Sequence, residues 1–295
     1  MSGAVPRISV VLTTYNRASV LSTTLDSVLS QTCADIELIV SDDCSPDHTE
    51  GLCREYMRRD PRVRYRRNPR NLRMPGNLNA AIAEARGQYI ANLHDGDIYR
   101  ADLLEKWSGA LDRHPNAAFV FNQYSVVEPD GSTRLHALEL PECIDGREFL
   151  LRHFTTQWGS PVFGTVMARK ACYDAVGPFD PKYSFNSDVE MWMRLAIRYD
   201  VAYVAEPLIR ITPREKAHLM TNRYLWECSV DIRVKRKALE LLAPRDRARR
   251  LRFEARARAH YAALALPALR RARWADLRQA LLLAATGRDE ISPPY

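Results

Sequence analysis

The stretch ANLHDGDIYR, residues 91–100, holds the pair of side chains best suited to chemistry. Asp95 and Asp97 are separated by one glycine, follow an apolar run and are preceded by His94. Two carboxylates spaced in this way on a turn can both present oxygens to one hard cation, and Mg²⁺ is commonly held by one or two carboxylates with phosphate oxygens and water. Such an ion neutralises a diphosphate as it leaves. Taken alone the pattern is weak, because a solvated acidic turn contains the same residues.

Several common motifs are missing from the sequence, and their absence narrows the class of protein. No GxGxxG follows the first predicted strand, which argues against a dinucleotide site, and no GxxxxGKS/T is present, which excludes a P-loop. Neither GxSxG nor HExxH occurs. The six cysteines include no CxxC pair, so they are predicted to be reduced thiols and not a zinc site.

The elements that must position the carboxylates alternate between strands and helices. Residues 7–12 and 35–43 are β-branched runs, and the apolar residues between them have helical spacing. Strand, helix and strand in this order make a βαβ unit, whose two strands are parallel. Further strands are predicted at 63–68, 88–93, 117–127 and 201–206. We therefore expect an α/β fold with a Rossmann-like, mostly parallel central sheet flanked by helices.

Polar residues recur where these predicted strands end. They stand after the first strand (13–16), after the second (42–43), at the acidic turn and around Asp188. Open α/β sheets bind ligands outside the carboxyl ends of their strands, so this pattern indicates a binding site more than packing.

Five segments in order resemble the family-2 glycosyltransferases of the A-type fold. They are ISVVLTTYNRASVLSTTLDSVLSQT, DIELIVSDDCSPDHT, NLNAAIAEARGQYIANLHDGD, GTVMARKACYDAVGPFD and SDVEMWMRL. The resemblance covers about residues 7–215. It implies a metal-dependent inverting enzyme that moves a sugar from a nucleoside-diphosphate-sugar donor to a hydroxyl of a glycan, a lipid-linked acceptor or a small molecule, in polysaccharide or glycoconjugate biosynthesis.

The resemblance also implies which residues bind the donor. Asp43 matches the residue that accepts a hydrogen bond from the nucleotide base, and Asp42 is the alternative. Asn79 has a second interpretation as a helix cap, and Arg73 could either pair with phosphates or be solvated. The remaining matches to the nucleotide pocket and its loop are Thr13, Tyr15, Asn16 and Asn71.

The metal-binding motif departs from the commoner form of the family, which reads Leu-Asp-x-Asp-Asp. Aligned without gaps, His94 and Gly96 replace two of its aspartates, although Asp95 and Asp97 still make a DxD. The implied cofactor is Mn²⁺ or Mg²⁺. His94 is either a ligand or a hydrogen-bonding neighbour of one, and an imidazole suits Mn²⁺ better than Mg²⁺.

Asp188 is the expected catalytic base. Inverting transfer needs a carboxylate to take the proton of the attacking hydroxyl, and a helix start favours the ionised form. Trp192 lies four residues on, on the same helix face, as an acceptor wall or as core. Other acceptor-side candidates are Glu190, Gly164 and Thr165. Arg210, Arg214 and His218 are the candidates for a loop over the diphosphate.

The net charge of +7 is unevenly distributed. Between Val234 and Arg278 there are fourteen Lys and Arg against four Asp and Glu, so the rest of the chain is mildly acidic. We expect a catalytic domain at 1–220, with its nucleotide-binding half at about 1–100 and its acceptor half at about 101–220. A basic helical extension should follow at 221–295, broken at Pro244 and Pro267.

The basic extension has two interpretations. It is either a cap with a solvated basic face or a face that meets an anionic membrane surface. No nucleic-acid partner is expected, because aromatic residues are not interleaved with the charges. No apolar run is long enough to span a bilayer and no leader is evident, so we expect a cytoplasmic location or a peripheral one at the inner face of the membrane.

Two other functions remain as alternatives to a glycosyltransferase. Nucleotidyl transfer on a similar fold is disfavoured, because the glycine-rich basic loop that such enzymes place after the first strand is missing. A non-catalytic nucleotide-sugar-binding relative is the second rival. Asp95, Asp97 and Asp188 argue against it, while His94 and Gly96 leave it open.

Overall fold

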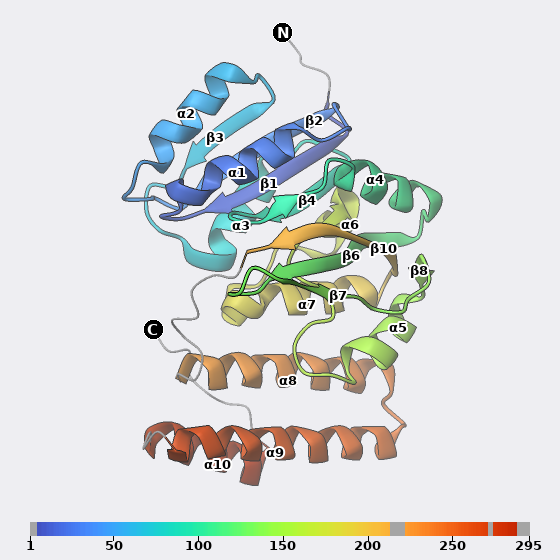
Figure 1. The fold of residues 1–295 in the computed structure, drawn as a ribbon. Coiled ribbons are helices and arrows are strands. Elements are labelled where there is room, and N and C mark those ends of the chain that lie inside the picture. The colour runs from blue at the N-terminus through green and yellow to red at the C-terminus, as the bar shows by residue number, and fades with distance from the viewer. Residues whose placement is uncertain (1–4, 213–221, 271–273, 288–295) are drawn as a thin grey trace. The chain divides into compact units, whose positions relative to one another are not determined.

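The chain forms two compact units that are interleaved in sequence. The computed structural model describes residues 5–212, 222–270 and 274–287. The first unit contains residues 1–146 and 162–213, and the second contains residues 147–161 and 214–295 (Figure 1). The sequence placed one boundary near residue 220. The second unit also takes residues 147–161, because Leu151 and Trp158 pack against the core formed by Ile232 and Phe253.

A single mixed sheet forms the centre of the first unit. Its order is β3-β2-β1-β4-β9-β6-β10-β5, with β7 paired to β6 and β8 paired to β10. The strands are β1 (Ile8–Thr14), β2 (Ile36–Asp42), β3 (Val63–Arg67), β4 (Tyr89–His94), β5 (Ile98–Tyr99), β6 (Ala117–Val127), β7 (Thr133–His136), β8 (Cys143–Ile144), β9 (Val166–Arg169) and β10 (Asp200–Ile211).

Strand direction changes half-way across the sheet. The β1 strand pairs in parallel with β2 and β4, and β10 pairs in parallel with β6, whereas β9 runs antiparallel between β4 and β6. The register Asn92↔Val166 places the start of β9 beside the end of β4. Residues 164–165 therefore lie at the sheet edge where the acidic turn begins, which a parallel strand would have placed at the opposite edge.

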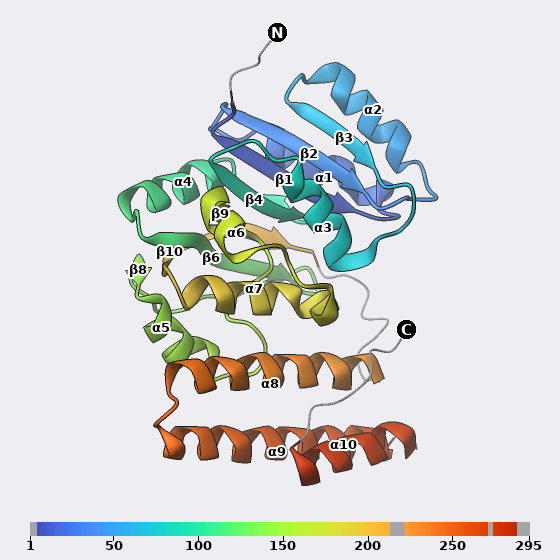
Figure 2. The ribbon, with the colours of Figure 1, turned by 180° about the vertical axis from the view of Figure 1, so that it is seen from behind.

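Helices cover both faces of this sheet (Figures 1 and 2). One face is covered by α1 (Ala18–Leu29), α2 (Thr49–Arg59) and α4 (Leu103–Arg113), and the other by α3 (Arg73–Ala83), α6 (Lys170–Val176) and α7 (Ser187–Ala196). In α1 the buried residues Leu21, Leu25 and Val28 recur at helical spacing and join the main core. The expected α/β fold, with a central sheet flanked by helices and C-terminal helices beyond it, is confirmed.

Glu37 is a buried carboxylate on β2 that ties three segments of the first unit together. It accepts hydrogen bonds from Ser9 Oγ at 2.7 Å, from Arg64 Nη1 at 2.8 Å, and from the backbone and side chain of Arg86 at 2.8–3.1 Å. Burial raises the pKa of Glu37, but these hydrogen bonds outweigh it and lower the pKa from 4.5 to about 2.

The second unit is helical. It contains α5 (Gly146–Phe149), a π-helical turn at Leu150–Phe154, α8 (Asn222–Leu242), α9 (Arg247–Arg270) and α10 (Trp274–Thr286). The chain breaks near Pro244, as expected, whereas α9 continues through Pro267. In the part of the chain that the structure describes, no helix has both the length and the apolar character that crossing a bilayer requires.

A buried lysine holds residues 157–159 to α8. The Lys235 side chain is fully buried, and its Nζ donates to Gln157 O at 2.7 Å, to Gly159 O at 2.7 Å and to Asp231 Oδ2 at 2.8 Å. Three donors thus meet three acceptors, which compensates the desolvation of the ammonium group.

We predict that Glu37→Gln flattens the acid side of the stability profile. Because the pKa of Glu37 is lower in the folded state, its contribution is fully present above about pH 4.5 and is lost as the pH falls through about 2. At neutral pH the contribution is at most about 3 kcal/mol, reduced because its arginine partners are partly exposed. Urea unfolding between pH 2 and 7 measures it. The exposed Glu55→Gln on α2 is the control, and an unchanged pH slope in Glu37→Gln would contradict the assignment.

Candidate functional site

Two side-chain hydroxyls hold the acidic turn in shape. The Thr24 hydroxyl of α1 accepts from Gly96 N and donates to Asp97 O, both at 2.9 Å. The Tyr99 hydroxyl accepts from His94 N at 2.8 Å and donates to His94 O at 2.9 Å. The backbone of the turn is thus satisfied by side chains that fit one geometry.

Gly96 gives the turn a backbone conformation that favours glycine. Its φ is +86°, a left-handed conformation that favours glycine, and a Cβ there would lie 2.7 Å from Arg17 Nη2. Arg17 Nε also lies 3.9 Å from Asp95 Oδ1, and Asp95 is 6% exposed. The guanidinium therefore occupies the space beside the turn and faces one of its two aspartates. The sequence did not single out Arg17, although it directly follows the strand-end residues 13–16.

The second aspartate of the turn faces the opposite side. His94 Nδ1 lies 3.9 Å from Asp97 Oδ2 and 3.5 Å from the Thr165 hydroxyl. Asp97 is 3% exposed and Thr165 is 2% exposed. The turn thus directs Asp95 toward an arginine and Asp97 toward an imidazole.

Gly164 marks the point where the turn meets the expected base. A Cβ built on Gly164 would lie 2.9 Å from His94 Cε1, 3.1 Å from His94 Nε2 and 3.1 Å from Asp188 Oδ2. The imidazole and the carboxylate therefore both lie close against Gly164, which leaves no room for a side chain at this position. Three residues that the sequence proposed from separate motifs are brought together here.

Asp188 is half-buried in the first turn of α7. Its Oδ1 accepts from Val189 N at 2.7 Å, while its Oδ2 faces Gly164. Carboxylates at a helix N-terminus are stabilised in the charged form by the exposed N–H groups there.

Trp192 and Glu190 do not line an acceptor site. Trp192 is fully buried and packs against Phe119 and Phe179, with ring centroids at 5.2 Å and 6.0 Å. Glu190 is 3% exposed and accepts from Arg194 Nε at 2.7 Å. Of the two interpretations of Trp192, an acceptor wall or core, its complete burial favours core packing.

A group of aromatic rings that the sequence did not single out lies beside His94. The half-buried Phe163 ring contacts the His94 ring edge-on at 5.3 Å and the Tyr124 ring at 5.3 Å, and Tyr124 stacks on His136 at 4.7 Å. Phe163 directly precedes Gly164, whereas Tyr124 and His136 come together only through the pairing of β6 with β7.

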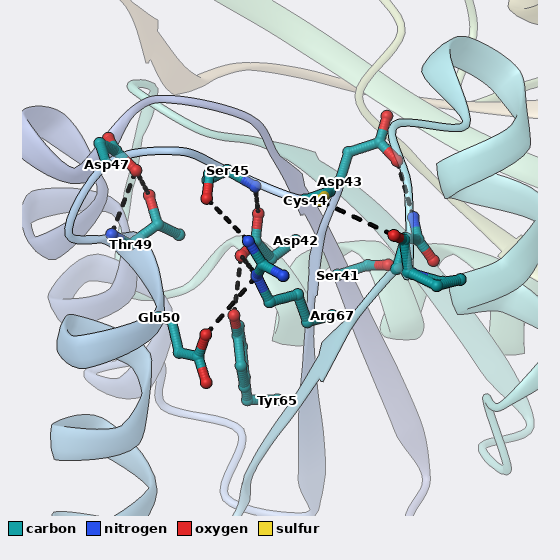
Figure 3. Close-up of polar contacts among 12 residues, drawn as sticks. Ser41, Asp42, Asp43, Cys44, Ser45, Asp47, Thr49, Glu50, Tyr65 and Arg67 are labelled. Atoms are coloured by element: carbon teal, nitrogen blue, oxygen red, sulfur yellow. Dashed lines mark hydrogen bonds and ion pairs between the residues drawn. The ribbon is translucent and has the colours of Figure 1, made fainter.

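The adjacent carboxylates Asp42 and Asp43 point to different partners (Figure 3). Asp42 is fully buried, accepts from Ser45 N at 2.9 Å and from the Tyr65 hydroxyl at 2.7 Å, and lies near Arg67. These contacts use the Asp42 carboxylate to stabilise its own loop. Asp42 is therefore less suited than Asp43 to bind a ligand.

Asp43 organises the loop before α3. Its Oδ1 accepts from Asn68 Nδ2 at 2.8 Å and from Leu72 N at 2.7 Å, and its Oδ2 accepts from Arg73 N at 2.8 Å. Asn71 Oδ1 also accepts from Arg73 N, at 2.9 Å. A carboxylate has about four acceptor positions, so these three bonds leave room for one more donor.

Left-handed backbone gathers at this edge of the sheet. Asn16, Cys44 and Arg73 have φ of 55°, 64° and 59°. Such conformations cost non-glycine residues on the order of 1 kcal/mol each and concentrate at functional sites. Asn16 N donates to Ser45 Oγ at 2.9 Å, which joins the ends of β1 and β2. Thr13 is paired with His94 in the sheet, and Tyr15 is 47% exposed.

The Asn79 side chain does not cap a helix, and its amide is already bonded to another segment of the chain and not directed at a donor sugar. Its Nδ2 donates to Phe179 O at 2.8 Å and its Oδ1 accepts from Phe179 N at 2.9 Å. Both ends of the amide thus fix the GPFD segment against α3. Arg210 is exposed on β10, in register with Ile98, which follows Asp97. Arg214 and His218 lie outside the described residues.

The donor set of the turn fits a divalent ion that is completed by a ligand. The described residues contain no group of three or more His, Cys, Asp and Glu arranged to hold a metal by themselves. Asp97 and His94 nevertheless place a carboxylate and an imidazole on the same side of the turn. Two protein donors suit an ion whose other positions are filled by phosphate oxygens and water.

Residues 9–174 match glycosyl transferase family 2. The chain belongs to this family. Glycosyltransferases are the enzyme class expected from the sequence, and the match confirms both the family and the class. The family-2 relatives differ in length from this chain, which spans 14–55% of each of the first five curated relatives.

Two curated relatives act in glycan synthesis by their names. The succinoglycan biosynthesis protein ExoO of Rhizobium meliloti is 31% identical over 169 residues, which are 54% of this chain and 48% of that protein. A Campylobacter jejuni enzyme, GalNAc(5)-diNAcBac-PP-undecaprenol beta-1,3-glucosyltransferase, is 26% identical over 197 residues, which are 64% of this chain and 60% of that protein.

Two solved structures share the fold of this family-2 member. TarS of S. aureus in complex with UDP-GlcNAc superposes with a TM-score of 0.63 at 15% identity, over 96% of this chain and 92% of that one. The mannosyltransferase PcManGT of Pyrobaculum calidifontis, in complex with GDP-Man and Mn²⁺, superposes with a TM-score of 0.57 at 18% identity, over 95% and 86%.

We predict that Tyr99→Phe destabilises the fold by about 1–3 kcal/mol, because it leaves the backbone N–H and C=O of His94 without their partner. Urea unfolding of the full chain measures this. Tyr15→Phe, which removes a hydroxyl from an exposed side chain, is the matched control. Equal stability of the two variants would show that the hydroxyl does not hold the turn.

Proposed function

We propose that this family-2 glycosyltransferase is an inverting enzyme that transfers a sugar from a nucleoside-diphosphate-sugar to a hydroxyl acceptor, in polysaccharide or glycoconjugate biosynthesis. The single observation that carries the proposal is the convergence of the Asp188 carboxylate and the His94 imidazole of the acidic turn at Gly164. A base held next to the expected phosphate-binding turn is what a direct displacement at the anomeric carbon needs.

Asp188 is the proposed general base. Its Oδ1 accepts from Val189 N, and its Oδ2 lies next to Gly164 and is the atom assigned to take the proton. The acceptor oxygen would lose its proton to this atom as it attacks the sugar. Gly164 permits this arrangement, because any Cβ there would press on both Asp188 and His94.

Asp97 and His94 are the proposed protein ligands of a divalent cation. Asp95 is the weaker candidate, because its carboxylate lies near Arg17. When bound, the cation would supply positive charge to the leaving diphosphate. Arg17 and Arg210 are placed to add charge from either side of the turn. The solved relative that carries Mn²⁺ with GDP-Man supports this proposal.

The donor nucleotide is proposed to lie along residues 13–16 and 43. Solved relatives carry UDP-GlcNAc or GDP-Man, which supports a nucleoside-diphosphate-sugar without fixing its base. The remaining acceptor capacity of Asp43 could take an N–H of that base. On the opposite side, Phe163 and Tyr124 offer ring surfaces against which the apolar face of an acceptor sugar can pack.

We predict that Asp188→Asn lowers kcat for transfer by about 10²–10⁴-fold while the Kd for the nucleoside diphosphate stays the same, because only proton removal is lost. Steady-state transfer with radiolabelled donor sugars and calorimetric nucleotide binding measure the two effects. Asp174→Asn, on the exposed ion pair with Lys170, is the control. Full turnover in Asp188→Asn would refute the base, and nucleotide binding by wild type with no turnover on any acceptor would favour a non-catalytic relative.

We predict that Asp97→Asn abolishes the Mn²⁺-dependent part of nucleoside-diphosphate binding. Thermal shift with UDP and GDP, with and without Mn²⁺, measures it, and electron paramagnetic resonance of Mn²⁺ reports the ion directly. His94→Ala should weaken Mn²⁺ more than Mg²⁺, since an imidazole ligand favours the former.

The exposed Asp130→Asn, on a surface turn, is the control for these binding measurements. A metal response that survives Asp97→Asn but disappears in Asp95→Asn would reverse the assignment of the two aspartates. Equal losses of Mn²⁺ and Mg²⁺ binding in His94→Ala would remove the imidazole from the ligand set.

A further inference from the structure

The exposed face of α9 has an apolar centre and basic edges. Residues 248, 251, 255, 259 and 262 are exposed, recur at helical spacing and are alanine except for Leu251, which is 59% exposed. Arg247 and Arg258, eleven positions apart, border this strip on one side, and Arg252 and Arg256 border it on the other. All four arginines are exposed.

The exposed face of α10 is more strongly apolar. Trp274, Leu281 and Leu282 are 66%, 51% and 60% exposed, while the opposite face of the helix, with Ala280 and Leu283, is buried in the core of the unit. Among the described residues, five of the nine exposed large apolar side chains belong to this helical unit, so the exposure is concentrated and not scattered.

The two helices meet without an exposed acid on this side. A Cβ on Gly287, at the end of α10, would lie 3.5 Å from Arg258 Nε, so this arginine lies between α9 and the end of α10. The acidic residues of the described parts of α9 and α10 are Glu254, which is paired with Arg236, and Asp276, which is 5% exposed. Among the described residues the apolar face is therefore bordered mainly by positive charge, and the exposed Glu240 of α8 is the acid that lines a cavity with Arg247 and Leu251.

We propose that the outer face of α9 and α10 is a docking surface for an anionic lipid bilayer. Leucine, alanine and tryptophan side chains would enter the headgroup region, and the bordering arginines would contact lipid phosphates. The proposal concerns the helical unit and does not depend on the proposed function. A bilayer would bring the enzyme to membrane-bound acceptors, and that consequence alone rests on the proposed function.

A second copy of the chain is a poorer occupant than a bilayer. In a two-fold dimer the same face meets itself, so the exposed arginines of one copy (Arg247, Arg252 and Arg258) would approach the arginine-bordered face of the other with no exposed carboxylate from these helices between them. Like charges brought together in this way cost energy, whereas anionic headgroups neutralise them. Charge complementarity therefore selects the bilayer.

The full chain is tested with vesicles of phosphatidylcholine containing phosphatidylglycerol and with vesicles of phosphatidylcholine alone. We expect sedimentation with the anionic vesicles only, decreasing with salt. Trp274 is the single exposed tryptophan of the five in the chain, so its emission should shift to shorter wavelength and be quenched by brominated lipids. Trp274→Phe should remove the fluorescence change and keep most of the binding.

Two sets of variants separate the apolar and the charged contributions. Leu281→Ser combined with Leu282→Ser should weaken vesicle binding by about 10-fold or more, and Leu135→Ser, an equally exposed leucine of the first unit, should leave it unchanged. Arg247→Gln, Arg252→Gln and Arg258→Gln together should weaken it by about 100-fold. Arg54→Gln with Arg59→Gln, exposed arginines of α2, are the charge control.

Three outcomes would overturn the proposal. The first is equal sedimentation with neutral and anionic vesicles, and the second is binding that the leucine and arginine variants do not change. The third is a concentration-dependent dimer in sedimentation velocity that Leu281→Ser and Leu282→Ser dissociate, because the face would then be covered by a second copy. None of these outcomes bears on Asp188 or Asp97, so failure here is distinguishable from failure of the proposed function.

Discussion

The site depends on a short turn whose backbone is bonded to two side-chain hydroxyls. At the end of β4 the Tyr99 hydroxyl bonds the N–H and C=O of His94. In the turn that follows, the Thr24 hydroxyl bonds Gly96 N and Asp97 O, so each hydroxyl acts as donor and acceptor at once. Because each hydroxyl fits one arrangement of the turn, the directions of His94, Asp95 and Asp97 are fixed before any ligand arrives. A catalytic group held in this way loses little conformational freedom when substrate binds.

Neighbouring carboxylates in this protein have different hydrogen-bond partners, and these partners separate their roles. Asp42 is sealed under Tyr65 while Asp43 organises the next loop. Glu190 forms a buried pair with Arg194, two residues after the half-buried Asp188. A buried carboxylate whose acceptor positions are filled by fixed protein donors stabilises the fold and is poorly placed to take a proton or a cation. Residue type alone did not distinguish these roles.

The sequence predicted the parts of the fold that depend on local periodicity. The alternating strands and helices, the start of the helical extension and the polar residues at strand ends all follow from patterns within a few dozen residues. The pairing of strands that are far apart in the chain could not be predicted from these local patterns. The antiparallel direction of β9, which brings Gly164 to the turn, and the pairing of β6 with β7, which brings Tyr124 to His136, depend on residues far apart in the chain.

The site residues divide in the same way. Asp188 and the acidic turn can be recognised in the sequence from motif spacing. Phe163 and Arg17 belong to no motif, and only their positions next to Gly164 and next to residues 13–16 could have drawn attention to them. Trp192 was ambiguous in sequence because an aromatic residue on the inner face of a helix has the same spacing whether it lines a cleft or fills a core. Only its complete burial distinguishes the two.

The path of the chain between the two units limits how this protein can be divided. It leaves the sheet after Gly146, enters the helical unit for fifteen residues and returns at Val162, two residues before Gly164. In the helical unit, Lys235 grips the carbonyl groups of Gln157 and Gly159 inside that excursion. A truncation near residue 220 would therefore leave residues 147–161, which belong to the helical unit, attached to the first unit without the helices that they pack against. The two units are therefore not separable modules. A truncated or exchanged helical unit would need residues 147–161 as well as the C-terminal segment from residue 214.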